Sequence, residues 1–213
     1  HAAQTAELIV DKATHPQAVA QWLCRLPAPL RALTLRGAES NAPLLADAAH
    51  ACGVGTIHVR THLRGGELDA AALLESRAQV ISVDLVADDA QTYESLTGID
   101  CYESIRSGVE LLVNSTRRDE AAGGGMPSRW IVPRITRRDA VLEQVERFYD
   151  RWLLFAGACV IDSPPESVAG PRIEALPLPR LARRRLELLH RTADLRQGTI
   201  AEPLQACIQE ARA

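Results

Sequence analysis

Short segments rich in β-branched and apolar residues recur along the chain, and stretches with helical periodicity separate them. The first four segments begin about 25 residues apart, the spacing of one strand-plus-helix unit. The longer gap before the fifth segment could hold a longer helical insertion. This alternation predicts an α/β protein with parallel strands. The six predicted strands are residues 7–12, 32–36, 56–63, 80–86, 130–137 and 158–162.

Three of the intervening stretches carry apolar side chains along one helical face. Pro16 precedes the first of these stripes and suits the first turn of a helix, where no N–H is needed. Residues 115–128 contain three consecutive glycines and predict a mobile surface loop. The three stripes are Val19, Trp22, Leu23 and Leu26; Tyr102, Ile105, Val109 and Leu112; and Val141, Val145, Phe148 and Trp152.

The composition changes after residue 162. The segments SPPES and PRIEALPLPR are rich in proline, and an arginine-rich helical stretch follows from about Leu181. We therefore expect a first domain over residues 1–162 and a short C-terminal extension over residues 163–213.

The predicted strands alternate between an apolar and a polar face. A parallel sheet with helices on both sides would be apolar on both faces, so this alternation favours a different arrangement. It predicts a partial (β/α)6 barrel of the TIM type, with an outer face under the helices and a polar, water-filled interior. Burying unpaired charges would cost several kcal/mol each, so we expect them to face water, one another or a polar ligand. The polar set is Thr34, Arg36, His58, Arg60, His62, Ser82, Asp84, Arg134 and Thr136.

Ligands of such folds bind beyond the carboxyl ends of the strands. The sequence places several candidates there: Gly37, Ala38 and Glu39 after the second strand, Thr61 and His62 after the third, Asp84 late in the fourth, Arg134 and Thr136 on the fifth, and Asp162 on the sixth.

Composition narrows the classes of function. The chain has 213 residues, a net charge of −3 and few aromatic residues, which argues against nucleic-acid binding. No run of apolar residues is long enough for a membrane span. Five widely separated cysteines form no CxxC pair and predict buried free thiols in a reducing cytoplasm.

Three segments resemble radical S-adenosylmethionine (SAM) enzymes. TLRGAES at the end of the second strand resembles the family's TLTGGEP, and SVDLVADDAQTYESLTG resembles its SLDGADAETYERLRG at the fourth strand. VPRITRRDAVLEQVERFYD corresponds to the fifth strand and its helix, and residues beyond 163 are weakly similar to a SPASM-type extension. The resemblance implies that Glu39 could hold the SAM ammonium group. The candidate cofactor-binding residues are Gly37, Glu39, Ser82, Asp84 and Arg134.

Each of these candidates also has a structural interpretation. Gly37 could simply permit a tight turn, and Glu39 could be solvated at a helix N-terminus, where a carboxylate is favoured. Ser82 and Asp84 could belong to a polar network satisfied by Arg60 or Arg134.

The departures from the family pattern are larger than the matches. The CxxxCxxC motif that holds the [4Fe–4S] cluster should follow the first strand. Here the predicted strand ends at Lys12, and Ala13, Thr14 and His15 lead directly to the helix at Pro16. A cluster needs grouped thiolates, and Cys24 stands alone on a predicted helix. The extension also lacks the cysteines of the SPASM type.

A zinc site is a weaker alternative. His50, Cys52, His58 and His62 form the pattern H-x-C-x5-H-x3-H, but His58 and His62 lie about 13 Å apart along one strand face. His50 and Cys52 fall at a predicted helix end. We therefore expect these histidines to line the polar interior or cap a helix, and we expect no metal site.

Three functions follow from these observations. The first is a non-catalytic, radical-SAM-like subunit that partners an active radical SAM enzyme in modifying a peptide or small molecule. The second is an active radical SAM enzyme, with a [4Fe–4S] cluster and SAM, whose cluster loops lie outside this sequence, which begins at His1. The third is a cluster-free barrel enzyme that performs acid–base chemistry with His62, Asp84 and Arg134.

Overall fold

A computed structural model describes residues 5–123, 129–162 and 193–194. Its described residues divide into two compact units. The first contains the chain up to Val59, Ser76–Ala78 and residues 193–194, and the second contains Arg60–Glu75 and residues 79–162. The predicted boundary near residue 163 and the predicted C-terminal extension lie outside the described residues, apart from the two residues of β7.

The fold is α/β with parallel strands, as the sequence predicts. Among the described residues the strands are hydrogen-bonded in the order β6-β5-β4-β3-β2-β1-β7. The pairs β1–β2, β1–β7, β4–β5 and β5–β6 are all parallel. The first unit contains β1 (Thr5–Ile9), α1 (Pro16–Cys24), β2 (Ala32–Arg36), α2 (Ala42–Ala51), most of β3 (Thr56–Thr61) and β7 (Ala193–Asp194). The second unit contains α3 (Glu67–Glu75), β4 (Val80–Asp84), α4 (Ala90–Thr97), α5 (Tyr102–Gly123), β5 (Trp130–Thr136), the 3-10 helix η1 (Asp139–Gln144), α6 (Val145–Ala156) and β6 (Val160–Asp162).

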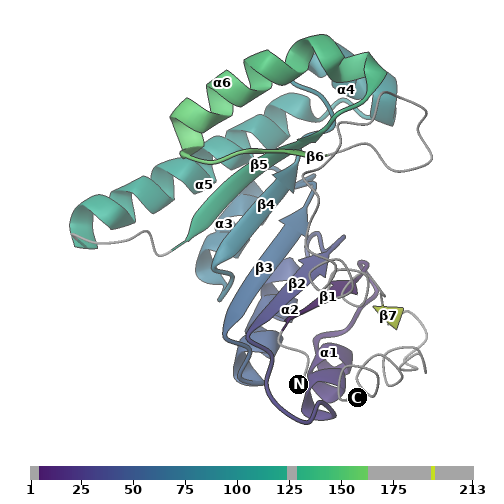
Figure 1. Cartoon of the computed structure of the whole chain (residues 1–213), viewed down its shortest axis with the longest axis vertical. Coiled ribbons are helices and arrows are strands. Elements are labelled where there is room, and N and C mark those ends of the chain that lie inside the picture. The colour runs from purple at the N-terminus through teal and green to yellow at the C-terminus, as the bar shows by residue number, and fades with distance from the viewer. Residues whose placement is uncertain (1–4, 124–128, 163–192, 195–213) are drawn as a thin grey trace, which may run out of the picture. The chain divides into compact units, whose positions relative to one another are not determined.

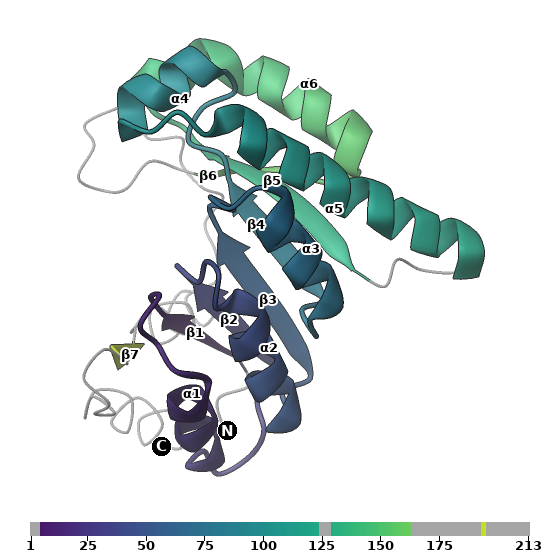
Figure 2. The ribbon, with the colours of Figure 1, turned by 180° about the vertical axis from the view of Figure 1, so that it is seen from behind.

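The first unit packs α1 and α2 side by side next to β1 and β2 (Figure 2). Leu8 of β1 lies in register with Leu35 of β2, and both are fully buried. Helix α1 begins at Pro16, where the sequence predicts a first-turn proline. The ring of His15 caps it by accepting a hydrogen bond from the N–H of Gln17 at 3.3 Å.

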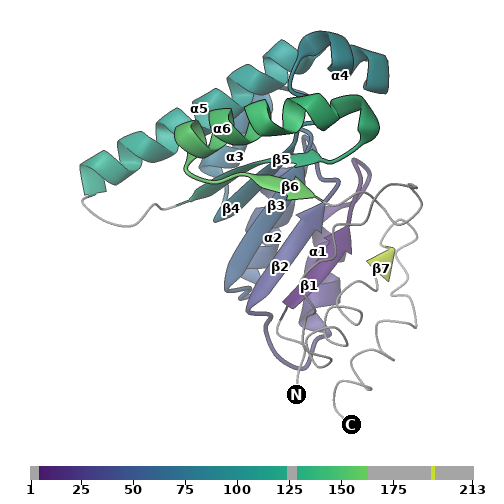
Figure 3. The same ribbon diagram turned by 45° about the horizontal axis from the view of Figure 1, so that its top comes forward.

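The second unit packs α5 and α6 against β5 (Figures 1 and 3). The apolar residues of β4 and β5, among them Ile81 and Ile135, are buried there. The helices contribute most of the stripes that the sequence predicts, although Val145 is only partly buried. Tyr102, Ile105, Val109 and Leu112 of α5 are buried, as are Val141, Phe148 and Trp152 of η1 and α6. None of the described helices is both long enough and apolar enough to cross a membrane.

The prediction that the first strand reaches Lys12 is wrong, because a turn ends β1 at Ile9. The Asp11 carboxylate accepts hydrogen bonds from the N–H of Ala13 and from the Thr14 hydroxyl, each at 3.0 Å. The amide nitrogen of Asn41 donates to the carbonyl oxygens of Asp11 and Thr14, at 2.8 and 3.1 Å. These bonds satisfy the backbone locally and stop the extended chain.

The prediction of a loop from residue 115 is also wrong over most of its length, because α5 continues to Gly123. Thr116 is buried, and its hydroxyl donates to the carbonyl oxygen of Leu112 at 2.9 Å. The guanidinium of Arg117 lies 5.2 Å from the ring centroid of Phe155 on α6. This cation–π contact supports the helix past its apolar stripe. Residues 124–128, which include the last two of the three glycines, lie outside the described part of the chain.

The cysteines of the described residues are free thiols, but the prediction that they are buried is wrong. Cys24 is exposed, and Cys52, Cys101 and Cys159 are partly exposed. Cys52 caps the C-terminus of α2 beside His50, so the prediction that this pair ends a helix is confirmed. The ring of His58 lies 3.2 Å from the hydroxyl of Thr34, which gives that strand histidine a polar partner.

Candidate functional site

Four charged side chains from four consecutive strands meet on the polar face of the second unit. Arg60 comes from β3, Asp84 from the end of β4, Arg134 from β5 and Asp162 from the end of β6. Each side chain retains between 16% and 24% of its exposure. Strand alternation places these residues opposite the buried Val83 and Ile135, so the polar face that the sequence predicts exists here. We call these four residues the charge tetrad.

The tetrad is held together by ion pairs of alternating sign. Arg60 donates from Nε to Asp84 Oδ2 at 2.7 Å and from Nη2 to Asp162 Oδ2 at 3.1 Å. Arg134 donates from Nε to Asp162 Oδ2 at 3.2 Å and from Nη2 to Asp162 Oδ1. The Nε atom of Arg134 also lies 3.6 Å from Asp84 Oδ1. Each carboxylate therefore faces both guanidinium groups.

Two positive and two negative groups make the tetrad electrically neutral. Charges this close to the protein interior need partners, because each would otherwise lose its hydration without compensation. The structural interpretation of Asp84, a network satisfied by Arg60 and Arg134, is therefore what the geometry shows. Asp162 completes that network from β6.

His62 and Ser82 lie near the tetrad in different ways. The Nδ1 atom of His62 is 3.4 Å from the backbone carbonyl oxygen of Asp84, while the carboxylate of Asp84 is directed to the arginines. The structure therefore brings Asp84 and Arg134 together and places His62 against the backbone of Asp84. Ser82 retains only 1% of its exposure. Contact between its side chain and a ligand would require the surrounding chain to move.

Gly37 and Glu39 belong to the first unit, in the turn between β2 and α2. Gly37 has a φ of 82°, in the left-handed region that favours glycine. A Cβ atom at Gly37 would lie 2.7 Å from the carbonyl oxygen of Val10. Both conditions explain a glycine here without a ligand. Glu39 is partly exposed, and its carbonyl oxygen accepts the N–H of Ala42 at 2.9 Å as α2 begins.

A second charged group lies at the start of α4. Asp88, whose side chain is fully buried, accepts hydrogen bonds from Arg147 Nε and Arg151 Nη1 of α6, each at 3.0 Å. Its backbone N–H donates to Gln144 Oε1 at 2.7 Å. Arg151 Nη1 also lies 3.4 Å from the Tyr102 hydroxyl oxygen. We call these five residues the Asp88 cluster; it fastens α6 to the β4–α4 connection.

The Asp88 cluster changes the titration of two of its members. Burial is the main reason that the pKa of Tyr102 rises to about 12, and the charge of Asp88 adds to the effect. The hydrogen bond to Asp88 is the main cause that raises the pKa of Arg147. The cluster thus keeps the phenol neutral and the guanidinium charged.

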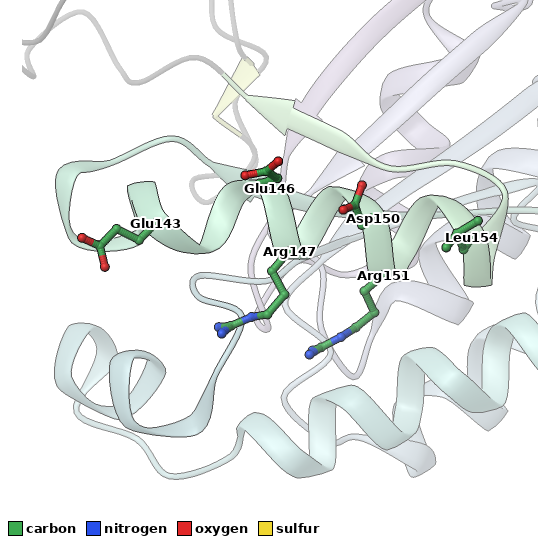
Figure 4. A pocket seen from close by; sticks show the side chains of 6 residues that line it. All are labelled: Glu143, Glu146, Arg147, Asp150, Arg151 and Leu154. Carbon is green, nitrogen blue, oxygen red and sulfur yellow. The ribbon is translucent and has the colours of Figure 1, made fainter.

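A pocket on α6 is lined by residues that the sequence did not single out. Figure 4 shows Arg147 and Arg151 leaving α6 on one side and Glu146 and Asp150 on the other. Both arginines donate hydrogen bonds to the buried Asp88, so this wall of the pocket has a structural role. The tetrad, at the carboxyl ends of the strands, is the better candidate for a functional site. The complete lining is Glu143, Glu146, Arg147, Asp150, Arg151 and Leu154.

The residues of the described chain do not fit an iron–sulfur cluster. The β1–α1 connection contains the Asp11–Thr14 turn and no cysteine. Cys24 and Cys52 belong to the first unit, and Cys101 and Cys159 to the second. Within the described ranges, no group of three or more His, Cys, Asp or Glu side chains could hold a metal ion. This includes the predicted alternative of His50, Cys52, His58 and His62.

Sequence reasoning missed the Asp88 cluster. The DDAQT stretch could have indicated the cluster, because it contains two adjacent aspartates before a helix. The second, Asp89, caps α4 by accepting a hydrogen bond from the N–H of Thr92 at 2.8 Å. The preceding residue, Asp88, is then free to point inward. Arg147 and Arg151 are spaced by four residues on α6, a pattern that is also typical of a solvated helix face.

No protein-family model matches this chain, and no curated protein matches it. The resemblance to radical SAM enzymes therefore stays a prediction that rests on the segments quoted above.

Proposed function

We propose that this chain is a non-catalytic, radical-SAM-like subunit that partners an active radical SAM enzyme in modifying a peptide or a small molecule. Its scaffold would be a partial (β/α)6 barrel of the TIM type. In support, α5 and α6 pack against β5, while the tetrad residues lie on the opposite, polar side of their strands. A doubly covered sheet would have an apolar second face.

The observation that carries the proposal is the self-neutralised tetrad. A polar ligand on this face needs charged groups that are available to it. The carboxylate of Asp84 faces two guanidinium groups, and both oxygens of Asp162 accept hydrogen bonds from Arg134 or Arg60. Binding a zwitterion such as SAM here would require breaking ion pairs that are largely shielded from water.

The β1–α1 connection supports the same proposal. In the radical SAM pattern this connection carries the three cysteines of the cluster. Here a short turn occupies it, and the side chain of Asn41 clamps that turn through the carbonyl oxygens of Asp11 and Thr14. Asn41 makes no side-chain cap bond at the start of α2. The turn is therefore tied to the rest of the first unit and provides no thiolate.

The acid–base enzyme has less support from the geometry. A general base needs a lone pair that can reach substrate, and a catalytic His–Asp pair needs a contact between ring and carboxylate. His62 contacts the carbonyl oxygen of Asp84, and the carboxylate is occupied by arginines. The active radical SAM enzyme remains a second proposal, for which cluster-bearing residues would have to come from elsewhere in the gene product.

Co-purification tests the proposed function. The tagged full-length gene product is isolated without oxygen from its native host, and bound proteins, iron and sulfide are measured. We expect a stoichiometric partner that carries the cluster, and we expect the chain to contain no iron after the partner is removed. A monodisperse monomer with no partner would contradict the proposal. Iron bound to the separated chain would instead support the active enzyme.

A control variant outside the tetrad distinguishes a specific complex with the partner from non-specific binding. Arg106→Gln changes a partly exposed arginine on α5 that pairs with Glu103 at 2.8 Å and takes no part in the tetrad. Asp84→Asn and Asp162→Asn disturb the tetrad. If the partner recognises the closed polar face, the tetrad variants lose the partner and Arg106→Gln keeps it.

A further inference from the structure

Two cysteines of the first unit lie at the C-terminal ends of adjacent helices. Cys24 is the last residue of α1 and is exposed. Cys52 is the C-cap of α2, where its backbone N–H bonds the carbonyl oxygen of Ala48 at 3.2 Å. The two helices pack against each other (Figure 2). Neither cysteine belongs to the charge tetrad or to the Asp88 cluster.

The thiol of Cys52 lies against the last turn of α1. Its Sγ atom donates to the carbonyl oxygen of Ala20 at 3.9 Å. Ala20 and Cys24 are four residues apart and therefore share one face of the helix. Burial raises the pKa of Cys52, and a hydrogen bond with the Cys24 thiol raises it further. The two thiols are thus neighbours.

We propose that Cys24 and Cys52 are a disulfide-forming pair that links the ends of α1 and α2. The oxidant is a small-molecule disulfide such as oxidised glutathione. The exposed Cys24 thiolate attacks one glutathione sulfur, the S–S bond breaks, and one glutathione thiolate leaves with the electron pair. The Cys52 thiolate then attacks the Cys24 sulfur and expels the second glutathione thiolate. The two protein thiols lose two electrons, and their two protons pass to the glutathione thiolates.

The order of these steps follows from exposure. Cys24 is accessible to a reagent in solution, whereas Cys52 is partly covered by α1. Burial raises the pKa of Cys52, which lowers its thiolate fraction and favours Cys24 as the thiol that reacts first with the oxidant in solution. A crosslink between two sequence-distant positions restricts the unfolded chain, so it stabilises the first unit. The inference does not depend on the proposed function, because that proposal rests on the charge tetrad and neither cysteine belongs to it.

The test incubates the folded full chain with oxidised glutathione and maps its disulfides by mass spectrometry. We expect one intramolecular Cys24–Cys52 crosslink, the loss of two hydrogen masses and two fewer titratable thiols. The melting temperature should rise by about 5–10 °C, and a reducing agent should reverse the change. Cys24→Ser and Cys52→Ala should each abolish the crosslink and the rise. Cys101→Ser and Cys159→Ser are matched controls that should retain both.

Three results would overturn the proposal. One is a stable glutathione adduct on Cys24 that Cys52 never resolves. Another is a crosslink that uses a different cysteine while Cys24 and Cys52 stay reduced. The third is a crosslink that persists in Cys24→Ser, a variant at an exposed position that is expected to fold normally. Far-UV circular dichroism of each variant before oxidation confirms that it is folded.

Discussion

Neutralising Asp162 tests whether the tetrad is a connected network. Asp162→Asn keeps the shape of the side chain and removes its charge, which leaves Arg60 and Arg134 with Asp84 as their carboxylate within the tetrad. Two unit charges about 4 Å apart interact by about 4 kcal/mol at an effective dielectric constant of about 20. Desolvation opposes this attraction. We therefore expect the free energy of unfolding to fall by about 2–3 kcal/mol, as for hydrogen bonds to charged groups.

The assay is urea denaturation followed by circular dichroism and tryptophan fluorescence. The control is Glu103→Gln, which breaks an ion pair with Arg106 whose side chains are 61% and 41% exposed. We expect Glu103→Gln to lower the free energy of unfolding by less than about 0.5 kcal/mol, and we expect this loss to become smaller at high salt. The loss at Asp162 should change less with salt, because its side chain is 24% exposed.

A double-mutant cycle then isolates the pairwise interaction. Arg134→Met removes the guanidinium and keeps most of the apolar stem. Combined with Asp162→Asn, it should show a coupling of about 1–3 kcal/mol. The reasoning is refuted if the two changes are additive within about 0.5 kcal/mol, or if Asp162→Asn costs no more than Glu103→Gln.

The remaining predictions concern the turn after β2, a buried tyrosine and the cofactor of the resembled family. Gly37→Ala should lower the free energy of unfolding by about 2–4 kcal/mol in urea denaturation, and Gly98→Ala by about 1 kcal/mol. Both glycines have a positive φ, but of the two only Gly37 would place a Cβ atom 2.7 Å from a carbonyl oxygen. Equal losses for the two variants would refute this role of the close contact. Tyr102 has a folded pKa of about 12, above its unfolded value, so stability should be full below about pH 10 and fall by about 3 kcal/mol between pH 10 and 12. Tyr102→Phe should flatten that part of the stability profile, and an unchanged slope would contradict the assignment. Calorimetric titration with SAM should show no saturable binding below about 1 mM, whereas a micromolar Kd would show that the tetrad opens to ligand.

Much of the fold could be predicted because local pattern and tertiary environment agree. The strand from Ala32 to Arg36 alternates strictly, and its apolar residues Leu33 and Leu35 are fully buried. The ends of β1 and α5 could not be predicted, because distant residues determine them. Asn41 clamps the turn that ends β1, and Phe155 of α6 supports the last part of α5.

For the candidate site, the sequence could predict which strand face carries the charged residues but not how all of them pair. Alternation placed Arg60, Asp84 and Arg134 together on the polar side, and the network with the arginines was one of the alternatives. The pairing with Asp162 required the order of the strands, because Arg60 and Asp162 are 102 residues apart in sequence. The Asp88 cluster was missed for the same reason, since its arginines come from α6.

The fate of iron in this chain tests the central claim most directly. The full-length gene product, free of its partner, is incubated without oxygen with ferrous iron and sulfide, and its iron content and visible spectrum are measured after desalting. We predict neither bound iron above background nor the broad visible absorbance of a [4Fe–4S] cluster. Four iron and four sulfide ions per chain, lost when cysteine is replaced by serine, would contradict the account.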